Sequence, residues 1–300
     1  GISLEADVFD AGITQIDNIR AALEDFKKSG KFVYAYGNTV SQGAYYLGSV
    51  ADKYYLNPAG LIELKGLSTE VTFFKNFAEK YGIGIQVIRH GKFKAAVEPF
   101  LRDDISPENK EQLSTLLNDI WANTSKKIAD SRKISLPELN MITDSLYSYL
   151  PNLSLKYKLA DQLIQKSEYD NIIRKKLNID ADKKINKISF AKYSESLESE
   201  NDGKKIAVLY ASGAIYNGKG YDGIYAENFV KEIKKIQKDD DIKAVVFRIN
   251  SPGGSANASD EILFELKQLK KKKPLIISFG DGAVEGGGCG NGRPRTGTLW

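Results

Sequence analysis

Hydrophobic and polar residues alternate along the first hundred positions in the manner of an α/β protein. The β-type runs lie at 31–37, 53–58 and 84–91. Apolar residues spaced by three and four at 13–30 and 69–82 predict two amphipathic helices, each ending at a glycine. Strands that alternate with helices are typical of a largely parallel sheet with helices on its faces.

The beginning of the chain is repeated near its end. Residues 1–43 match residues 244–286 at a constant offset of 243 without a gap, with Gly37 on Gly280 and the same strand–loop–helix–strand pattern. Self-similarity at this spacing predicts a duplicated domain rather than a short-period solenoid. Because a strand at 204–215 and a helix at 226–238 precede the second copy, symmetry predicts that the first copy has lost about 40 residues.

The middle of the chain is helical and charged. A long helix is predicted at 105–133, where Ser106 is a suitable N-cap and Pro107 a suitable first residue. A polar stretch rich in Ser and Glu follows at 191–205 and favours a linker. The expected domains are a first α/β unit at 1–104, a helical bridge at 105–190, a linker at 191–204, a second α/β unit at 205–283 and an aberrant Gly-rich tail at 284–300.

The tail differs in character from the segment that it should resemble. Residues 39–58 of the first copy have the pattern of a turn, a helix and a strand, whereas the sequence from Gly282 onward is rich in glycine and has no apolar period. A natural disordered tail is one interpretation. A frameshift or misread end is another, and we favour it. We therefore expect a fragment truncated at both ends.

Composition excludes several classes of protein. The 300 residues are 42% hydrophobic, which is ordinary for a globular chain of about two domains. The net charge of +4 is scattered along helix faces, so we expect no nucleic-acid partner. No apolar run approaches the roughly 18–20 residues of a membrane span. With Cys289 and His90 as the single residues of their types, we expect no disulfide, no metal site and no cofactor.

Two segments carry candidate chemistry. The turn from Ser251 to Ser255 contains Gly253 and Gly254 between a buried strand and a helix, which suits an oxyanion hole, an anion site or an ordinary strand–helix turn. Lys94 follows a Gly turn and leads into an apolar "AAV". A desolvated lysine has a lowered pKa and can act as a general base, although most lysines are solvated surface groups.

The residues around these two segments resemble a known family. "GKFKAAVEPFLRDDISPENKE" at 91–111, "VVFRINSPGGSANAS" at 245–259 and the duplicated layout are similar to the signal peptide peptidase A (protease IV) family in its long, double-domain form, from residue 1 to about 283. The resemblance implies an α/β fold of duplicated crotonase- or Clp-protease-like units, with parallel sheets flanked by helices, joined by a helical bridge. It also implies a membrane-anchored Ser-Lys serine protease that degrades cleaved signal peptides.

The same resemblance implies where the protein works and with what. Its substrates would be signal peptides, and it would assemble as a homo-tetramer. The catalytic part would lie outside the cytoplasm at the bacterial inner membrane, held by an anchor upstream of this chain.

Site residues carry over position by position. Lys94 matches the family's general base, and Gly253 and Gly254 match its oxyanion hole. Glu285 occupies the position of the nucleophilic serine, and Gln42 occupies the same position in the first copy. Because a glutamate does not readily form a peptidase acyl-enzyme, we expect the chain as written to be inactive.

Two other functions remain open. A non-catalytic protein that binds peptides or scaffolds an oligomer is favoured by Glu285 if the tail is genuine. A crotonase-type acyl-coenzyme A enzyme would need an acid/base carboxylate pair, for which Glu98 and Glu285 are the candidates. The motif "KAAVEPF" has no place in such an enzyme.

Overall fold

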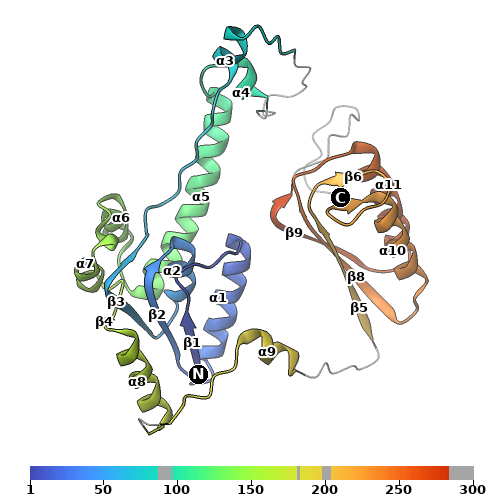
Figure 1. The fold of residues 1–300 in the computed structure, drawn as a ribbon. Coiled ribbons are helices and arrows are strands. Elements are labelled where there is room, and N and C mark those ends of the chain that lie inside the picture. The colour runs from blue at the N-terminus through green and yellow to red at the C-terminus, as the bar shows by residue number, and fades with distance from the viewer. Residues whose placement is uncertain (87–94, 96, 181–182, 198–203, 284–300) are drawn as a thin grey trace. The chain divides into compact units, whose positions relative to one another are not determined.

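The computed structural model describes residues 1–86, 95, 97–180, 183–197 and 204–283 (Figure 1). The chain divides into two compact units. The first comprises Gly1–Ala11 and Gln15–Ile185, and the second comprises Gly12–Thr14 and the chain from Asn186 onward. Each unit is built on its own parallel sheet. The predicted α/β class with parallel sheets flanked by helices is therefore confirmed.

The first unit has a four-stranded sheet in the order β1-β2-β3-β4. Its strands are β1 (Ile2–Glu5), β2 (Val33–Val40), β3 (Lys53–Ile62) and β4 (Gln162–Leu163). Its helices are α1 (Ile13–Lys27), α2 (Gln42–Gly48), α3 (Lys75–Lys80), α4 (Glu98–Leu101), α5 (Pro107–Arg132), α6 (Leu136–Asp144), the 3₁₀ turn η1 (Tyr147–Tyr149), α7 (Pro151–Lys156) and α8 (Lys166–Leu177).

Both faces of this sheet are covered. Successive residues of a strand point to opposite faces, and β3 shows this with neighbouring tyrosines. Tyr54 packs edge-on against Tyr45 of α2, with ring centroids 5.1 Å apart. Tyr55 packs against Tyr169 of α8 at 5.5 Å, and Tyr169 also stacks on Tyr36 at 5.1 Å. Helices on both faces exclude water from the strands, which is the arrangement that parallel sheets require.

Helix α5 extends from the sheet to α3 and α4 at its far end (Figure 1). Its 26 residues span about 39 Å. Ser106 caps its start by accepting the Asn109 N–H at 3.2 Å, and Pro107 follows. At the other end Arg132 donates to the Lys158 carbonyl and to Asp161, each at 2.9 Å. The sequence thus predicted this helix and its cap correctly.

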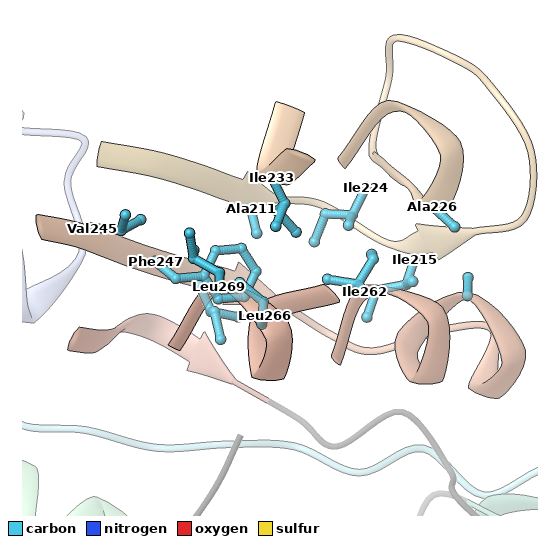
Figure 2. Packing of buried hydrophobic residues seen from close by; sticks show 12 residues of the cluster. Ala211, Ile215, Ile224, Ala226, Ile233, Val245, Phe247, Ile262, Leu266 and Leu269 are labelled. Atoms are coloured by element: carbon cyan, nitrogen blue, oxygen red, sulfur yellow. The ribbon is translucent and has the colours of Figure 1, made fainter. Parts of the chain in front are cut away.

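The second unit has a three-stranded parallel sheet in the order β5-β8-β9 and a short ribbon of β6 and β7. Its strands are β5 (Lys205–Ser212), β6 (Ile215–Tyr216), β7 (Ile224–Tyr225), β8 (Ile242–Ser251) and β9 (Leu275–Ala283). Its helices are α9 (Phe190–Glu195), α10 (Ala226–Lys238) and α11 (Ala256–Lys270). Figure 2 shows the buried core of this unit, to which β8 contributes Val245 and Phe247 and α11 contributes Ile262 and Leu266.

The sequence repeat is also a structural repeat. Adding 243 to the bounds of α1 gives 256–270, which are the bounds of α11, and β1 and β2 fall on β8 and β9. In each copy the two strands are parallel neighbours. The registers differ by one residue, because Ile2 pairs with Val33 whereas Val245 pairs with Leu275. The duplication predicted from the sequence is therefore present as a strand–helix–strand unit.

Two sequence expectations near the arm formed by α3, α4 and α5 need correction. The helix expected at 69–82 is limited to Lys75–Lys80. It does not begin earlier because the Phe74 N–H is donated to the Pro99 carbonyl at 2.6 Å. It ends at Lys80, two residues before Gly82, whose φ is +66°. The strand expected at 84–91 does not include residues 84–86, and its other residues lie outside the described part.

Candidate active site

The Gly-rich turn joins β8 to α11, and hydrogen bonds to the short strand β6 hold it in place. The Ile215 N–H of β6 donates to the Gly253 carbonyl at 3.1 Å, and the Ser255 N–H donates to the Ile215 carbonyl at 2.9 Å. These two bonds form an isolated parallel bridge between Ile215 and Gly254. Ser255 then caps α11 by accepting the Ala258 N–H at 3.3 Å. The turn is thus fixed on both sides of Gly254.

Gly254 is a glycine because the two backbones touch. A Cβ added at Gly254 would lie 2.3 Å from the Ile215 carbonyl oxygen and 2.6 Å from its nitrogen. Every other residue type would force β6 away from the turn. The sequence identified both glycines but gave no sign of Ile215, because the two segments are distant along the chain.

The two glycine N–H groups are not equivalent. The Gly253 N–H is already donated to the Ser251 hydroxyl at 3.1 Å. In a parallel bridge the flanking residues bond across, so the N–H of the central residue points away from the partner strand. The Gly254 N–H accordingly points away from β6, and it meets no acceptor among the residues that the structure describes. Of the two glycines, Gly254 is therefore the one whose N–H has no acceptor within the described part of the chain.

Such a donor suits a developing oxyanion. Preorganised N–H groups stabilise the negative oxygen of a tetrahedral intermediate. The donor also lies just before the N-terminus of the 15-residue helix α11, where the helix dipole favours negative charge. No group of three or more His, Cys, Asp or Glu side chains suited to a metal ion occurs within the described ranges.

The end of β9 lies beside this turn. Ala283 pairs with Ser251, and a Cβ at Gly280 would come within 2.9 Å of the Asn250 Cβ. Glu285 is two residues further along and lies outside the described residues, as does Lys94. Whether Lys94 meets these groups remains a prediction.

The first copy shows what occupies the corresponding position there. Gln42 is the first residue of α2, whose N-cap is Ser41. Its side-chain oxygen accepts the N–H groups of Lys65 and Gly66, each at 3.0 Å, and its amide donates to the Gly66 carbonyl at 3.0 Å. Gln42 thus holds the backbone after β3 in place and has no free polar atom for chemistry.

Other serines near the family position also have structural partners. Ser41 accepts the Ala44 N–H at 3.3 Å, and Ser278 accepts a hydrogen bond from Arg248 at 2.8 Å. These contacts agree with the sequence register, which placed neither serine at the nucleophile position. Their roles in a helix cap and a cross-strand contact account for both hydroxyls.

The structure also bears on the acyl-coenzyme A alternative. Glu98 is only 3% exposed, and its carboxylate accepts hydrogen bonds from the Ser106 hydroxyl, the Ser106 N–H at 3.3 Å and the Asn109 amide at 3.2 Å. Burial would raise the pKa of the Glu98 carboxyl, but these hydrogen bonds outweigh burial and hold the pKa below its ordinary value. A carboxylate committed to three donors is poorly suited to acid/base catalysis.

Comparison with known proteins shows which family the chain resembles. Residues 25–180 match peptidase family S49. Protease 4 of Salmonella typhi is 35% identical over 90% of this chain and 45% of its own length. Protease 4 of Haemophilus influenzae is 34% identical over 96% and 49%, and the chloroplastic serine protease SPPA of Arabidopsis thaliana is 33% identical over 96% and 44%.

The chain spans about half the length of the curated relatives that it matches. The S49 match covers residues 25–180, including β2, β3, β4 and α5, and the longer alignments cover 90% or more of the chain. The Gly-rich turn, where the Gly254 N–H meets no acceptor in the described ranges, fits peptidase chemistry. The chain therefore belongs to peptidase family S49.

Proposed function

We propose that the whole protein is a serine endopeptidase that uses a Ser-Lys pair, with Lys94 as the general base. The Gly254 N–H supports this most directly, because it is a preorganised donor beside the end of β9. The aligned relatives include a protein named as a serine protease. The chain has one histidine, His90, and this is compatible with the proposed mechanism because a Ser-Lys pair needs no histidine.

In this mechanism the neutral amine of Lys94 removes the proton of a serine hydroxyl, which attacks the scissile carbonyl. The Gly254 N–H stabilises the oxyanion that forms. The lysine then delivers the proton to the leaving amine, and a water molecule hydrolyses the acyl-enzyme. A lysine acts as a base near neutral pH only where burial or neighbouring positive charge lowers its pKa.

We propose further that the chain as written does not perform this reaction. Glu285 stands at the serine position. A carboxylate there would repel the oxyanion, and its acylation would give an anhydride rather than an ester. The inactivity belongs to this sequence and not to the family.

A serine-directed phosphonate tests both statements. We would treat four proteins and measure adducts by intact mass: the unaltered chain, Glu285→Ser, Glu285→Ser with Lys94→Ala, and, as the matched control, Glu285→Ser with Lys92→Ala. We expect an adduct on Glu285→Ser and on the control with Lys92→Ala, and no adduct on the other two. An adduct on the unaltered chain refutes the inactivity. No adduct on Glu285→Ser, in a chain whose second unit is folded by hydrogen exchange, refutes the assigned nucleophile position.

The tail decides how this result applies to the natural protein. Reading the source DNA from the codon of Gly280 in all three frames tests the proposed frameshift. We expect another frame to encode Ala-Ser-Gly-Gly-Tyr and a continuing second unit. A confirmed Glu285 with the stop after Trp300 would refute the frameshift.

The substrates proposed are signal peptides, and the location proposed is a membrane surface reached through an anchor upstream of this chain. A protein of Enterococcus faecium named as a putative signal peptide peptidase is 34% identical over 113 residues. Within the described residues, no helix combines the length and apolarity needed to cross a bilayer. We also propose a homo-tetramer outside the cytoplasm at a bacterial inner membrane. Membrane fractionation and light scattering of the full-length protein test the location and the assembly.

A non-catalytic peptide-binding or scaffold protein is the second candidate. Neither copy has a serine at the family position, where Gln42 and Glu285 stand. In this case the unaltered chain would bind a fluorescent signal peptide without cleaving it. Anisotropy that stays unchanged with rising chain concentration would refute peptide binding.

A further inference from the structure

The sheet of the second unit has one face in the core and the other open to solvent. The core face carries Val245 and Phe247 of β8, which pack with residues of α10 and α11. Successive residues of a strand point to opposite faces, so the residues between them lie on the other side. We call that side the open face, and its large side chains are those of Ile206, Val208, Tyr210, Val246 and Ile276.

The open face is apolar and accessible. Ile206, Tyr210 and Ile276 are 65%, 70% and 59% exposed, and Val208 is 48% exposed. Val208, Val246 and Ile276 are partners in the strand register, so they form one row across all three strands. A parallel sheet is ordinarily covered on both faces, because bare strands leave apolar side chains in water. An apolar surface that crosses a whole sheet therefore marks an interaction site.

The first unit shows the corresponding face with a cover. Ser3 corresponds to Val246 at the offset of 243, and its hydroxyl lies 2.7 Å from the Tyr169 hydroxyl of α8. Tyr169 is fully buried in a cluster with Tyr36 and Tyr55 of that sheet. Helix α8 thus covers in the first unit the face that is open in the second.

The chemistry of the open face suits a second sheet. Valine and isoleucine occupy its central row, and such side chains interdigitate when two sheets pack about 10 Å apart. Arg248 lies beside this row, and its guanidinium donates to the Ser278 hydroxyl at 2.8 Å and to the Phe279 carbonyl. These hydrogen bonds are made within the same sheet, so a partner does not need to supply an opposite charge.

The dimensions of the open face indicate how strong such a contact is. Strands β5 and β8 pair over eight positions. With a rise of about 3.3 Å per residue and a strand spacing of about 4.8 Å, the three-stranded face measures about 26 by 14 Å. Two such faces would bury about 750 Å² together, which is at the low end of specific interfaces. We therefore expect weak association that depends on concentration.

We infer that the open face is a self-association surface, through which two copies of this chain pack face to face about a two-fold axis. A two-fold dimer brings the same patch of both copies together, so the patch must be complementary to itself. A flat apolar face without an unpaired charge meets that requirement. The inference rests on neither the proposed peptidase chemistry nor the proposed tetramer, so a failure of the phosphonate experiment leaves it standing.

The first test measures the molar mass of the full chain by light scattering at about 1–100 μM. It compares the unaltered chain with Ile276→Lys, which places a charge on the open face, and with Phe264→Lys as the matched control. Phe264 is 58% exposed, close to the 59% of Ile276, but it belongs to α11, which packs on the core face. We expect a monomer–dimer equilibrium for the unaltered chain and the control, and a Kd raised about tenfold or more in Ile276→Lys.

The second test locates the surface even if Ile276→Lys does not fold. Cys289, the single cysteine of the chain, is replaced by serine, and Val208→Cys or Phe264→Cys then supplies one thiol. We expect a maleimide to label Val208→Cys about tenfold more slowly at high chain concentration than at low, because dimers shield the thiol. Phe264→Cys should be labelled at the same rate at both concentrations. Far-UV circular dichroism checks that each variant is folded.

Each contrary result overturns the inference. A chain that stays monomeric over the whole range does not associate through any surface. Dimers that persist equally in Ile276→Lys, or that leave the labelling rate of Val208→Cys unchanged, form through a different surface. Slow labelling of Val208→Cys at every concentration would show that another part of the same chain covers the open face.

Discussion

Gly254→Ala is the sharpest test of the site geometry. The added Cβ would lie 2.3 Å from the Ile215 carbonyl oxygen, whereas ordinary contacts begin near 3.4 Å, so the two backbones must separate by roughly 1 Å. The bonds Ile215 N–H to Gly253 and Ser255 N–H to Ile215 are 3.1 and 2.9 Å long, and this separation breaks both.

The cost follows from those two bonds. A backbone hydrogen bond contributes about 0.5–1.5 kcal/mol, so losing both costs the second unit about 1–3 kcal/mol. Overpacking of a close contact costs a similar amount. The Gly254 N–H would also be displaced from its present direction, which removes the oxyanion donor.

The assay is amide hydrogen exchange at single-residue resolution. We expect the Ile215 and Ser255 amides to exchange about tenfold faster relative to Phe247 in β8. Gly218→Ala is the control, because its φ of +76° carries the left-handed penalty while the nearest atom to its added Cβ is 3.9 Å away. We expect Gly218→Ala to leave the exchange of the Ile215 and Ser255 amides, relative to Phe247, unchanged. If Gly254→Ala also leaves it unchanged, the reasoning from the close contact is wrong.

Three further changes test the first unit. Tyr169→Ala removes a ring that stacks on one tyrosine and packs edge-on against another, and it should cost about 3–5 kcal/mol in denaturant unfolding. Tyr169→Phe loses one hydroxyl contact and should cost about 0.5–1.5 kcal/mol; equal losses would contradict the packing role of the ring. Burial raises the pKa of Asp161, but a backbone N–H and Arg132 outweigh burial and hold that pKa below its ordinary 3.8. Its stabilisation is therefore present above pH 3.8 and is lost as the pH falls through the lower folded pKa, so Asp161→Asn should flatten the acid side of a plot of Tm against pH. A plot with the same acid slope would refute that linkage. Gln42→Ala should expose the Gly66 amide to exchange about tenfold faster than in Gln42→Glu, which keeps the acceptor; equal exchange would show that the side chain does not hold this backbone.

Local signals in the sequence predicted much of the fold. The repeat at an offset of 243 located α11 from α1. Ser106 and Pro107 marked the start of α5, because capping depends on the residue itself and its next turn. The helix expected at 69–82 failed for the opposite reason, since the Phe74 N–H binds Pro99, a residue beyond the reach of local pattern.

The candidate site divides in the same way. From sequence alone, the glycine pair and the motif around Lys94 were identified, and Glu98 was considered only as an acid/base candidate. In the structure Glu98, the first residue of α4, is hydrogen-bonded to the start of α5, because its three donors belong to Ser106 and Asn109. The predicted roles of Lys94 and Glu285 stay predictions, since both residues lie outside the described part.

The sequence by itself determined the duplicated α/β pattern, the capped helices and the glycines at 253 and 254, because each depends on periodicity or on the conformation of one or two residues. Tertiary structure decided which of the two glycine N–H groups lacks an acceptor among the residues that the structure describes. That choice depends on β6, whose Ile215 bonds to Gly253 and Ser255 from 38 and 40 residues away. A backbone bridge between distant segments has no periodic signature, because any residue type supplies the same N–H and carbonyl groups.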